Sequence, residues 1–228
     1  MLRQSHFPAN SSVLSLLRDY VAPQPVPLAE AEHLMDGNMH TITNVCHLYG
    51  YSDVTFRSEH QHLLQVPYSR EELLWASQHD AVLTLVYGSV QRIQGRSQGQ
   101  VRMDDWISQN LPKGSRHKRR PEWRLVLRPS LEFVKTGVVA RQLTTLKRRS
   151  DFADLQILLS TLYLDLRIFG KKGTFSRSTS TVIFPHTLDA CRLGVHVENG
   201  IVKVFAERDV GRNPSFQLTP CWKPRWNR

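Results

Sequence analysis

Apolar residues recur at helical spacing in the first quarter of the chain. One face collects Leu28, Ala31, Met35, Met39, Ile42, Val45 and Cys46. This spacing predicts a single helix over residues 28–48. Ser69, with Glu72 three residues later, forms a capping-box pattern that predicts a second helix over residues 69–78.

Strand-like composition alternates with these two helices. The expected strands are 13–21, 51–58 and 81–90. The resulting β-α-β…α-β order favours a ferredoxin-like, RRM-like half over residues 1–90. Residues 91–122 are rich in glycine, proline and charge, which predicts a basic loop or insertion with a short helix near 104–110.

The remaining residues, 123–228, predict helices followed by an antiparallel sheet. The expected elements are a strand over 123–134, a helix over 140–149, a short apolar helix over 152–161, alternating strands over 162–168 and 174–184, a hairpin over 191–207 and a last strand over 215–222. Asn199-Gly200 fits the type I′ turn of that hairpin. The predicted fold class is therefore α+β.

Composition narrows the class of protein. The 228 residues contain no apolar run long enough for a transmembrane helix, and the N-terminus makes a poor signal peptide. The three cysteines, Cys46, Cys191 and Cys221, are far apart and include no CxxC pair. We therefore expect a reducing cytoplasmic setting, with no metal, no other cofactor and no membrane partner.

Positive charge is concentrated in one segment. Residues 111–150 hold twelve Lys or Arg and two acids, whereas the rest of the chain is balanced, so this segment accounts for the whole formal net charge of +10. Such a concentration is typical of proteins that bind a polyanion, and nucleic acid is the favoured partner over a partner protein or a solvated face.

The helix expected within the basic segment is two-sided. Apolar residues Val139, Leu143 and Leu146 form one arc, and cations occupy the opposite side. The residues expected to contact nucleic acid are Arg141, Lys147, Arg148, Arg149 and Lys135, together with Arg116, Lys118, Arg119 and Arg120 of the preceding loop.

Histidines form a second stripe on the predicted helix 28–48. His33, His40 and His47 are seven residues apart, a rise of about 10.5 Å that is too long for two ligands of one metal ion. They are either exposed surface histidines or include one proton carrier, since the pKa of histidine lies near neutrality.

A hydroxyl-rich stretch supplies the other polar cluster. In "FSRSTST" (175–181), five hydroxyls surround Arg177, which suits either an ordinary strand or a phosphate-holding site. Walker, GxSxG, HExxH and paired-carboxylate motifs are absent from the sequence, so NTPase and common hydrolase classes lack support.

Four stretches in this order resemble the CRISPR repeat-RNA processing endoribonucleases, especially the subtype I-F enzyme and its type IV relatives. They are "LMDGNMHTITNVCHLYGYSDVTF", "ARQLTTLKRRSD", "FSRSTST" and "CRLGVHVENGIVKVFA". The sequence departs from the family at Thr144 and Thr145, where the I-F enzyme has arginines.

The resemblance implies metal-independent cleavage of a CRISPR repeat stem-loop, in which the RNA 2′-hydroxyl attacks the adjacent phosphate. It implies His40 as the general acid or base, with His47 as the fallback, Ser178 holding the ribose or phosphate, and Arg177 stabilising charge. Retention of the guide RNA with other subunits of a CRISPR effector complex is left open. The alternatives are a non-catalytic RNA-binding subunit and a helix-turn-helix DNA-binding protein centred on Ser150-Asp151.

Overall fold

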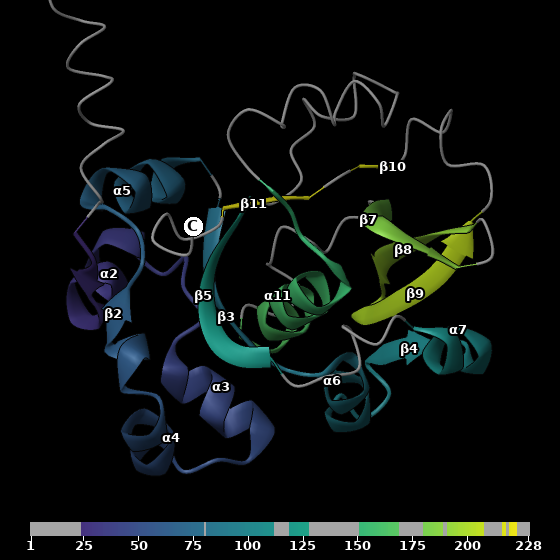
Figure 1. The fold of residues 1–228 in the computed structure, drawn as a ribbon, viewed down its shortest axis with the longest axis horizontal. Coiled ribbons are helices and arrows are strands. Elements are labelled where there is room, and N and C mark those ends of the chain that lie inside the picture. Colours follow the sequence, from purple (N-terminus) through teal and green to yellow (C-terminus); the bar gives the residue numbers. More distant parts are fainter. Residues whose placement is uncertain are drawn as a thin grey trace, which may run out of the picture.

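The computed structural model describes residues 24–79, 81–111, 119–127, 151–168, 180–188, 191–207, 216–217 and 219–222 (Figure 1). Their helices are α2 (Leu28–Met35), α3 (Ile42–Tyr49), α4 (Asp53–Glu59), α5 (Arg70–Gln78), α6 (Val90–Arg96), α7 (Asp105–Asn110) and α11 (Leu155–Ile168), with a short 3-10 helix, η1 (Gln61–Leu64). Their strands are β1 (Val26–Pro27), β2 (Gln65–Val66), β3 (Ala81–Gly88), β4 (Val101–Met103), β5 (Arg119–Leu127), β6 (Asp151–Phe152), β7 (Ser180–Leu188), β8 (Cys191–Glu198), β9 (Ile201–Glu207), β10 (Phe216–Gln217) and β11 (Pro220–Trp222). The predicted α+β class is confirmed.

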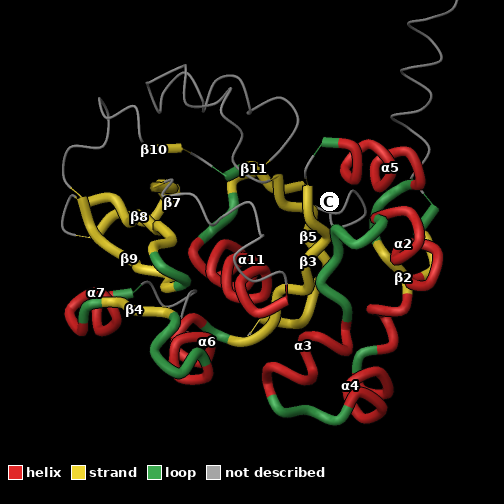
Figure 2. Tube along the Cα trace, turned by 180° about the vertical axis from the view of Figure 1, so that it is seen from behind, coloured by secondary structure: helices red, strands yellow, loops and turns green. Residues whose placement is uncertain are grey.

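Two larger sheets stand on either side of the central helix α11 (Figures 1 and 2). The first sheet has the strand order β3-β5-β11-β6 and is antiparallel. The second has the order β10-β7-β8-β9-β4, with parallel pairs at both edges. Helices α2 and α5 lie beyond the first sheet, on the side away from α11 (Figure 1), whereas α3 contacts α11.

Helix α11 is buried on all sides. Every residue from Leu155 to Asp165 is buried, as expected for a helix enclosed between two sheets. The predicted strand over 162–168 is therefore wrong, because complete burial removes the periodicity that separates helix from strand. Asp154, rather than Ser150 or Asp151, caps the helix, and its Oδ1 accepts a hydrogen bond from the Ile157 amide at 2.9 Å.

The enclosure of α11 also bears on the helix-turn-helix alternative. A recognition helix must be free to enter a DNA groove, and α11 is covered by protein. Residues 151–152 form strand β6 of the first sheet instead of a turn between helices. The structure therefore gives this alternative no support.

The helix predicted over residues 28–48 is broken into α2 and α3. Asp36 and Gly37 have positive φ values of 42° and 83°, which end α2 in a turn. The chain then runs beside β3, where the His40 amide donates to the Leu83 carbonyl at 2.9 Å. Thr41 begins α3 with a capping box that is completed by Asn44.

The strand predicted over residues 51–58 is a helix, α4. Its start is fixed by Ser52, whose hydroxyl accepts from the Thr55 amide at 3.4 Å. Asp53 and Arg57 form an i,i+4 ion pair at 2.8 Å along its surface. The β-branched and aromatic residues that suggested a strand are thus outweighed by the cap.

The described residues of the predicted loop or insertion 91–122, which are 91–111 and 119–122, are more regular than we predicted. The short helix is confirmed as α7, but α6 and β4 precede it. Strand β4 joins the second sheet through a parallel pairing with β9. Strand β5 then joins the first sheet beside β3.

Several local predictions are confirmed. Helix α5 begins with the capping box of Ser69 and Glu72. The β8–β9 hairpin turns at Asn199 and Gly200, which have φ values of 51° and 74°.

The described part of the predicted RRM-like half differs from the expected β-α-β…α-β order. Within residues 24–90, helices outnumber strands, and β3 is the long strand of this stretch.

The described helices include none that is both long and apolar enough to cross a membrane.

Candidate nucleic-acid interface

Most residues predicted to bind or cleave RNA lie outside the described residues. These are Arg116, Lys118, Lys135, Arg141, Lys147, Arg148, Arg149, Arg177 and Ser178. Of the basic segment, the structure describes Leu111 and residues 119–127, and β5 begins at Arg119-Arg120, where Arg120 is exposed. The structure therefore places the part of the basic segment that forms β5.

His40 is fully buried. Its Nε2 lies 3.0 Å from the Asp165 carboxylate of α11, and its Nδ1 lies 2.9 Å from the Thr84 hydroxyl of β3. Because an ionised carboxylate only accepts hydrogen bonds, Nε2 donates to Asp165, and the second hydrogen bond joins Nδ1 to the Thr84 hydroxyl. His40 thus joins the chain before α3 to both the first sheet and the central helix.

This geometry corrects the histidine stripe. His33 lies in the last turn of α2 and His47 lies in α3, and both are exposed. His40 lies between the two helices with no exposed surface. A general base must come within hydrogen-bond distance of the proton that it removes. His40 has both ring nitrogens bonded inside the protein, which favours a structural role for it.

Sequence reasoning missed the partners of His40. Asp165 is the single carboxylate of the apolar stretch 155–168, and a lone acid in such a stretch is a signal for a buried polar contact. Thr84 carries a hydroxyl group in the otherwise apolar run of β3, and its side chain is also fully buried. The pairing itself joins residues 125 apart in sequence, which no local pattern predicts.

The pairing of β3 and β5 is irregular where β5 begins. Val86 pairs with Glu122 and Gly88 pairs with Arg119, so two steps along β3 match three along β5. Such a β-bulge tolerates proline, and Pro121 lies within it. The Pro121 carbonyl accepts a hydrogen bond from His62 Nε2 at 3.0 Å.

An aromatic cluster covers β3 next to this bulge. The Tyr87 ring makes edge contacts with Tyr51 at 5.5 Å and with Phe56 at 5.2 Å between centroids. His60 lies 4.6 Å from Phe56 and 6.0 Å from His62. Tyr87 and Phe56 are buried, whereas Tyr51 and His60 are partly exposed and His62 is exposed. Aromatic side chains thus adjoin the start of β5, which lies within the basic segment.

The arginines near the aromatic cluster are of two kinds: some bind a carboxylate, and one lies over an aromatic ring. Arg57 is held by Asp53, and Arg124 donates to Glu122 at 2.8 Å. Arg92 lies over the Tyr51 ring, with its guanidinium carbon 5.0 Å from the ring centroid. Helices α3, α4 and α6 gather at this end of the molecule (Figure 1), so that the aromatic rings and Arg92 belong to one region.

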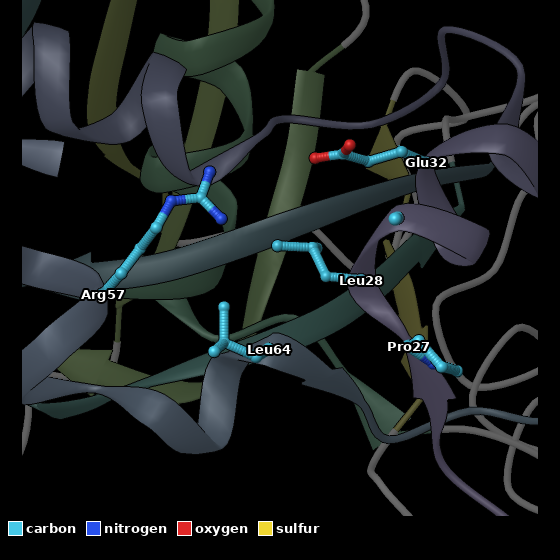
Figure 3. A pocket seen from close by; sticks show the side chains of 6 residues that line it. Pro27, Leu28, Glu32, Arg57 and Leu64 are labelled. Carbon is cyan, nitrogen blue, oxygen red and sulfur yellow. The ribbon is translucent and has the colours of Figure 1, made fainter. Parts of the chain in front are cut away.

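A pocket of about 310 Å³ opens beside α2 (Figure 3). Leu28 and Leu64 line it, and Glu32 and Arg57 extend toward it from different sides. Burial raises the pKa of Asp53, but hydrogen bonds from Arg57 and Thr43 outweigh burial and hold that pKa below its usual value. The guanidinium at the pocket is therefore already engaged by a carboxylate, and we assign no ligand to it.

Among the described residues, no three His, Cys, Asp or Glu side chains form a group that could hold a metal ion. The cysteines Cys46, Cys191 and Cys221 are free thiols, and all three are buried.

No family model, curated protein or solved structure matches the chain.

Proposed function

We propose that this protein binds a folded RNA through the basic segment 111–150. The observation that carries the proposal is the confinement of the whole net charge of +10 to this segment. Cations that neutralise phosphates release condensed counterions, which provides most of the affinity of such proteins for nucleic acid. The aromatic cluster beside the start of β5 supports the proposal, because exposed rings stack on unpaired bases.

Folded RNA is favoured over duplex DNA as the partner. Specific DNA readers commonly place an exposed helix in the major groove, and the apolar helix expected to do so is enclosed as α11. RNA is recognised by phosphate contacts, by the 2′-hydroxyl and by stacking, for which arginine and tyrosine are suited. The proposal includes a reducing cytoplasmic location, which the three free cysteines suit.

The test measures RNA affinity as a function of salt concentration. We expect salt-sensitive binding to an RNA stem-loop and weaker binding to its DNA copy. Replacing Arg141, Lys147, Arg148 and Arg149 by alanine should flatten the log–log salt dependence by somewhat under one unit per lost phosphate contact. The control removes equal charge elsewhere, at Arg70, Arg102, Arg167 and Lys203. Unchanged affinity and slope in the first variant, with the fold intact, would refute the assignment.

Cleavage of CRISPR repeat RNA is a second proposal, supported by the resemblance of four stretches to the repeat-processing endoribonucleases. In this proposal the RNA 2′-hydroxyl is the nucleophile, and the protein, alone or with other subunits of an effector complex, positions it and moves protons. Of the two candidate bases, His47 is exposed and His40 is buried, so His47 is now the better one. A ferredoxin-like arrangement of residues 1–90 also remains a prediction, since strand 13–21 lies outside the described residues.

Cleavage is tested with the same stem-loop in EDTA. We expect a 2′,3′-cyclic phosphate end, no product from an RNA with a 2′-deoxy substitution at the cut site, and loss of product in His47→Ala. Cleavage that requires Mg²⁺, or that survives the 2′-deoxy substitution, would rule out this chemistry. Stable binding without any product would leave the non-catalytic RNA-binding subunit as the function.

A further inference from the structure

Arg92 differs from the other arginines near the aromatic cluster. Arg57 and Arg124 each bind a carboxylate, whereas no ion pair joins Arg92 to an acid within the part of the chain that the structure describes. Its guanidinium carbon lies 5.0 Å from the Tyr51 ring centroid and 5.8 Å from that of Tyr87. Tyrosine rings attract a cation without consuming its hydrogen-bond donors, so these remain available to a ligand.

The backbone around Arg92 fixes where its side chain begins. Arg92 lies in the first turn of α6, and its amide donates to the Ser89 hydroxyl at 3.2 Å. Gly88 has a φ of +85°, and a Cβ added there would lie 3.5 Å from Arg92 Cδ. The arginine stem thus passes close to a glycine in the left-handed conformation.

The two rings beneath Arg92 are also oriented by the protein. The Tyr87 hydroxyl donates to the Tyr51 hydroxyl at 3.1 Å, and the Tyr49 ring meets Tyr87 edge-on at 5.9 Å. Tyr51 and Arg92 are both partly exposed, so a ligand can reach this stacked pair. A planar cation held against a ring is pre-organised and loses little conformational freedom on binding.

We propose that Arg92 and Tyr51 form a subsite for an unpaired nucleotide that flanks the RNA stem. This inference rests on the proposed RNA binding. It adds a contact with an unpaired nucleotide, whereas the basic segment is proposed to contact the folded RNA through its phosphates. The base would stack on the Arg92–Tyr51 pair, and the guanidinium would donate to the phosphate beside it.

The neighbouring charges favour a nucleotide over an acidic peptide. Arg96, also without an ion pair among the described residues, lies one helical turn after Arg92 and comes near Gly50. Arg119 pairs with Gly88 across the strands, which brings the start of β5, within the basic segment, to this place. A nucleotide combines a π-face with a phosphate and so matches both the rings and the cations, whereas a carboxylate side chain matches only the cations.

The experiment compares two RNAs by fluorescence anisotropy: the stem-loop alone, and the same stem-loop with a six-nucleotide unpaired flank. We expect the flank to tighten wild-type binding on the order of 10-fold, the usual effect of stacking one base. An abasic flank should lose this gain, because it keeps the phosphates and lacks the bases. Arg92→Ala should lose the gain while keeping its affinity for the stem-loop alone.

Two variants separate stacking from charge. Arg92→Lys keeps the charge but not the planar surface, so most of the gain from the flank should still be lost. Arg102→Ala is the matched control, because it removes one exposed cation from β4, in the other sheet. It should keep the gain from the flank.

The outcomes separate this inference from the proposed function. Wild-type protein that binds neither RNA would overturn both. Binding to the stem-loop with no gain from the flank, or a gain that survives Arg92→Ala, would overturn the subsite alone. Equal weakening of both RNAs by Arg92→Ala would show a general electrostatic contribution and would also overturn the subsite.

Discussion

Replacing His40 by alanine tests whether this residue holds the fold together. His40 and Asp165 are 0% and 1% exposed, and the variant removes the hydrogen bonds to Asp165 and to Thr84. Leaving a buried group without its hydrogen-bond partner costs about 1–3 kcal/mol of the free energy of unfolding, and this variant affects two such groups, Asp165 and Thr84. For a chain of this size, each kcal/mol lowers Tm by about 2–4 °C, so we expect a fall on the order of 10 °C.

Thermal unfolding followed by circular dichroism measures this effect. His47→Ala is the matched control: it removes an exposed imidazole from α3 and should change the free energy of unfolding by no more than about 0.5 kcal/mol. A double-mutant cycle with Asp165→Asn should give a coupling of about 0.5–3 kcal/mol, because the two side chains are in contact.

A wild-type Tm in His40→Ala would refute the structural role, and so would strictly additive effects in the cycle. The same variant separates the two roles considered for His40. A purely catalytic histidine would change cleavage and leave Tm unchanged. A structural histidine lowers Tm first, and any loss of cleavage then follows the loss of folded protein.

Two further predictions concern other buried sites. Burial, with a smaller contribution from Asp53, raises the pKa of Cys46 to about 11 against the lowering effect of Arg57. The stability that this thiol contributes should therefore be complete below about pH 9 and be lost as pH rises through about 11, an effect that urea unfolding at several pH values would detect and that Cys46→Ala would lack. A Cβ at Gly194 would lie 2.3 Å from the Phe205 ring, so Gly194→Ala should cost about 1–3 kcal/mol in thermal unfolding. Combining it with Phe205→Leu should recover part of that loss, and no recovery would contradict the steric explanation.

Local signals in the sequence predicted the elements whose ends are capped or turned by their own residues. The capping box at Ser69 and the Asn199-Gly200 turn gave α5 and the β8–β9 hairpin correctly. The same kind of signal was present at Ser52 and was outweighed by the β-branched and aromatic residues that follow. Caps were thus more reliable than composition in this chain.

Contacts distant in sequence explain the remaining errors. The helix predicted over 28–48 is broken because residues 38–40 pair with β3, which local spacing cannot reveal. Helix α11 is buried between two sheets, so no polar face marks its helical spacing, and the alternation of Leu162, Leu164 and Leu166 was read as a strand. In the candidate site, the sequence singled out His40 but neither of its partners, Thr84 and Asp165. It also missed Arg92, because the contact of Arg92 with Tyr87 of β3 depends on the fold.

The pairing of β4 with β9 has a consequence for the synthesis of the chain. Val101 pairs with Val202, so the second sheet needs residues made about a hundred positions apart. The first sheet likewise takes β3 from before the basic segment and β5 and β11 from later in the chain. A nascent chain that ends where the basic segment begins, at residue 111, therefore holds β3 and β4 without their partners. Neither half can complete a core alone, so a nick between α7 and β5 should leave two fragments that survive only as an associated pair.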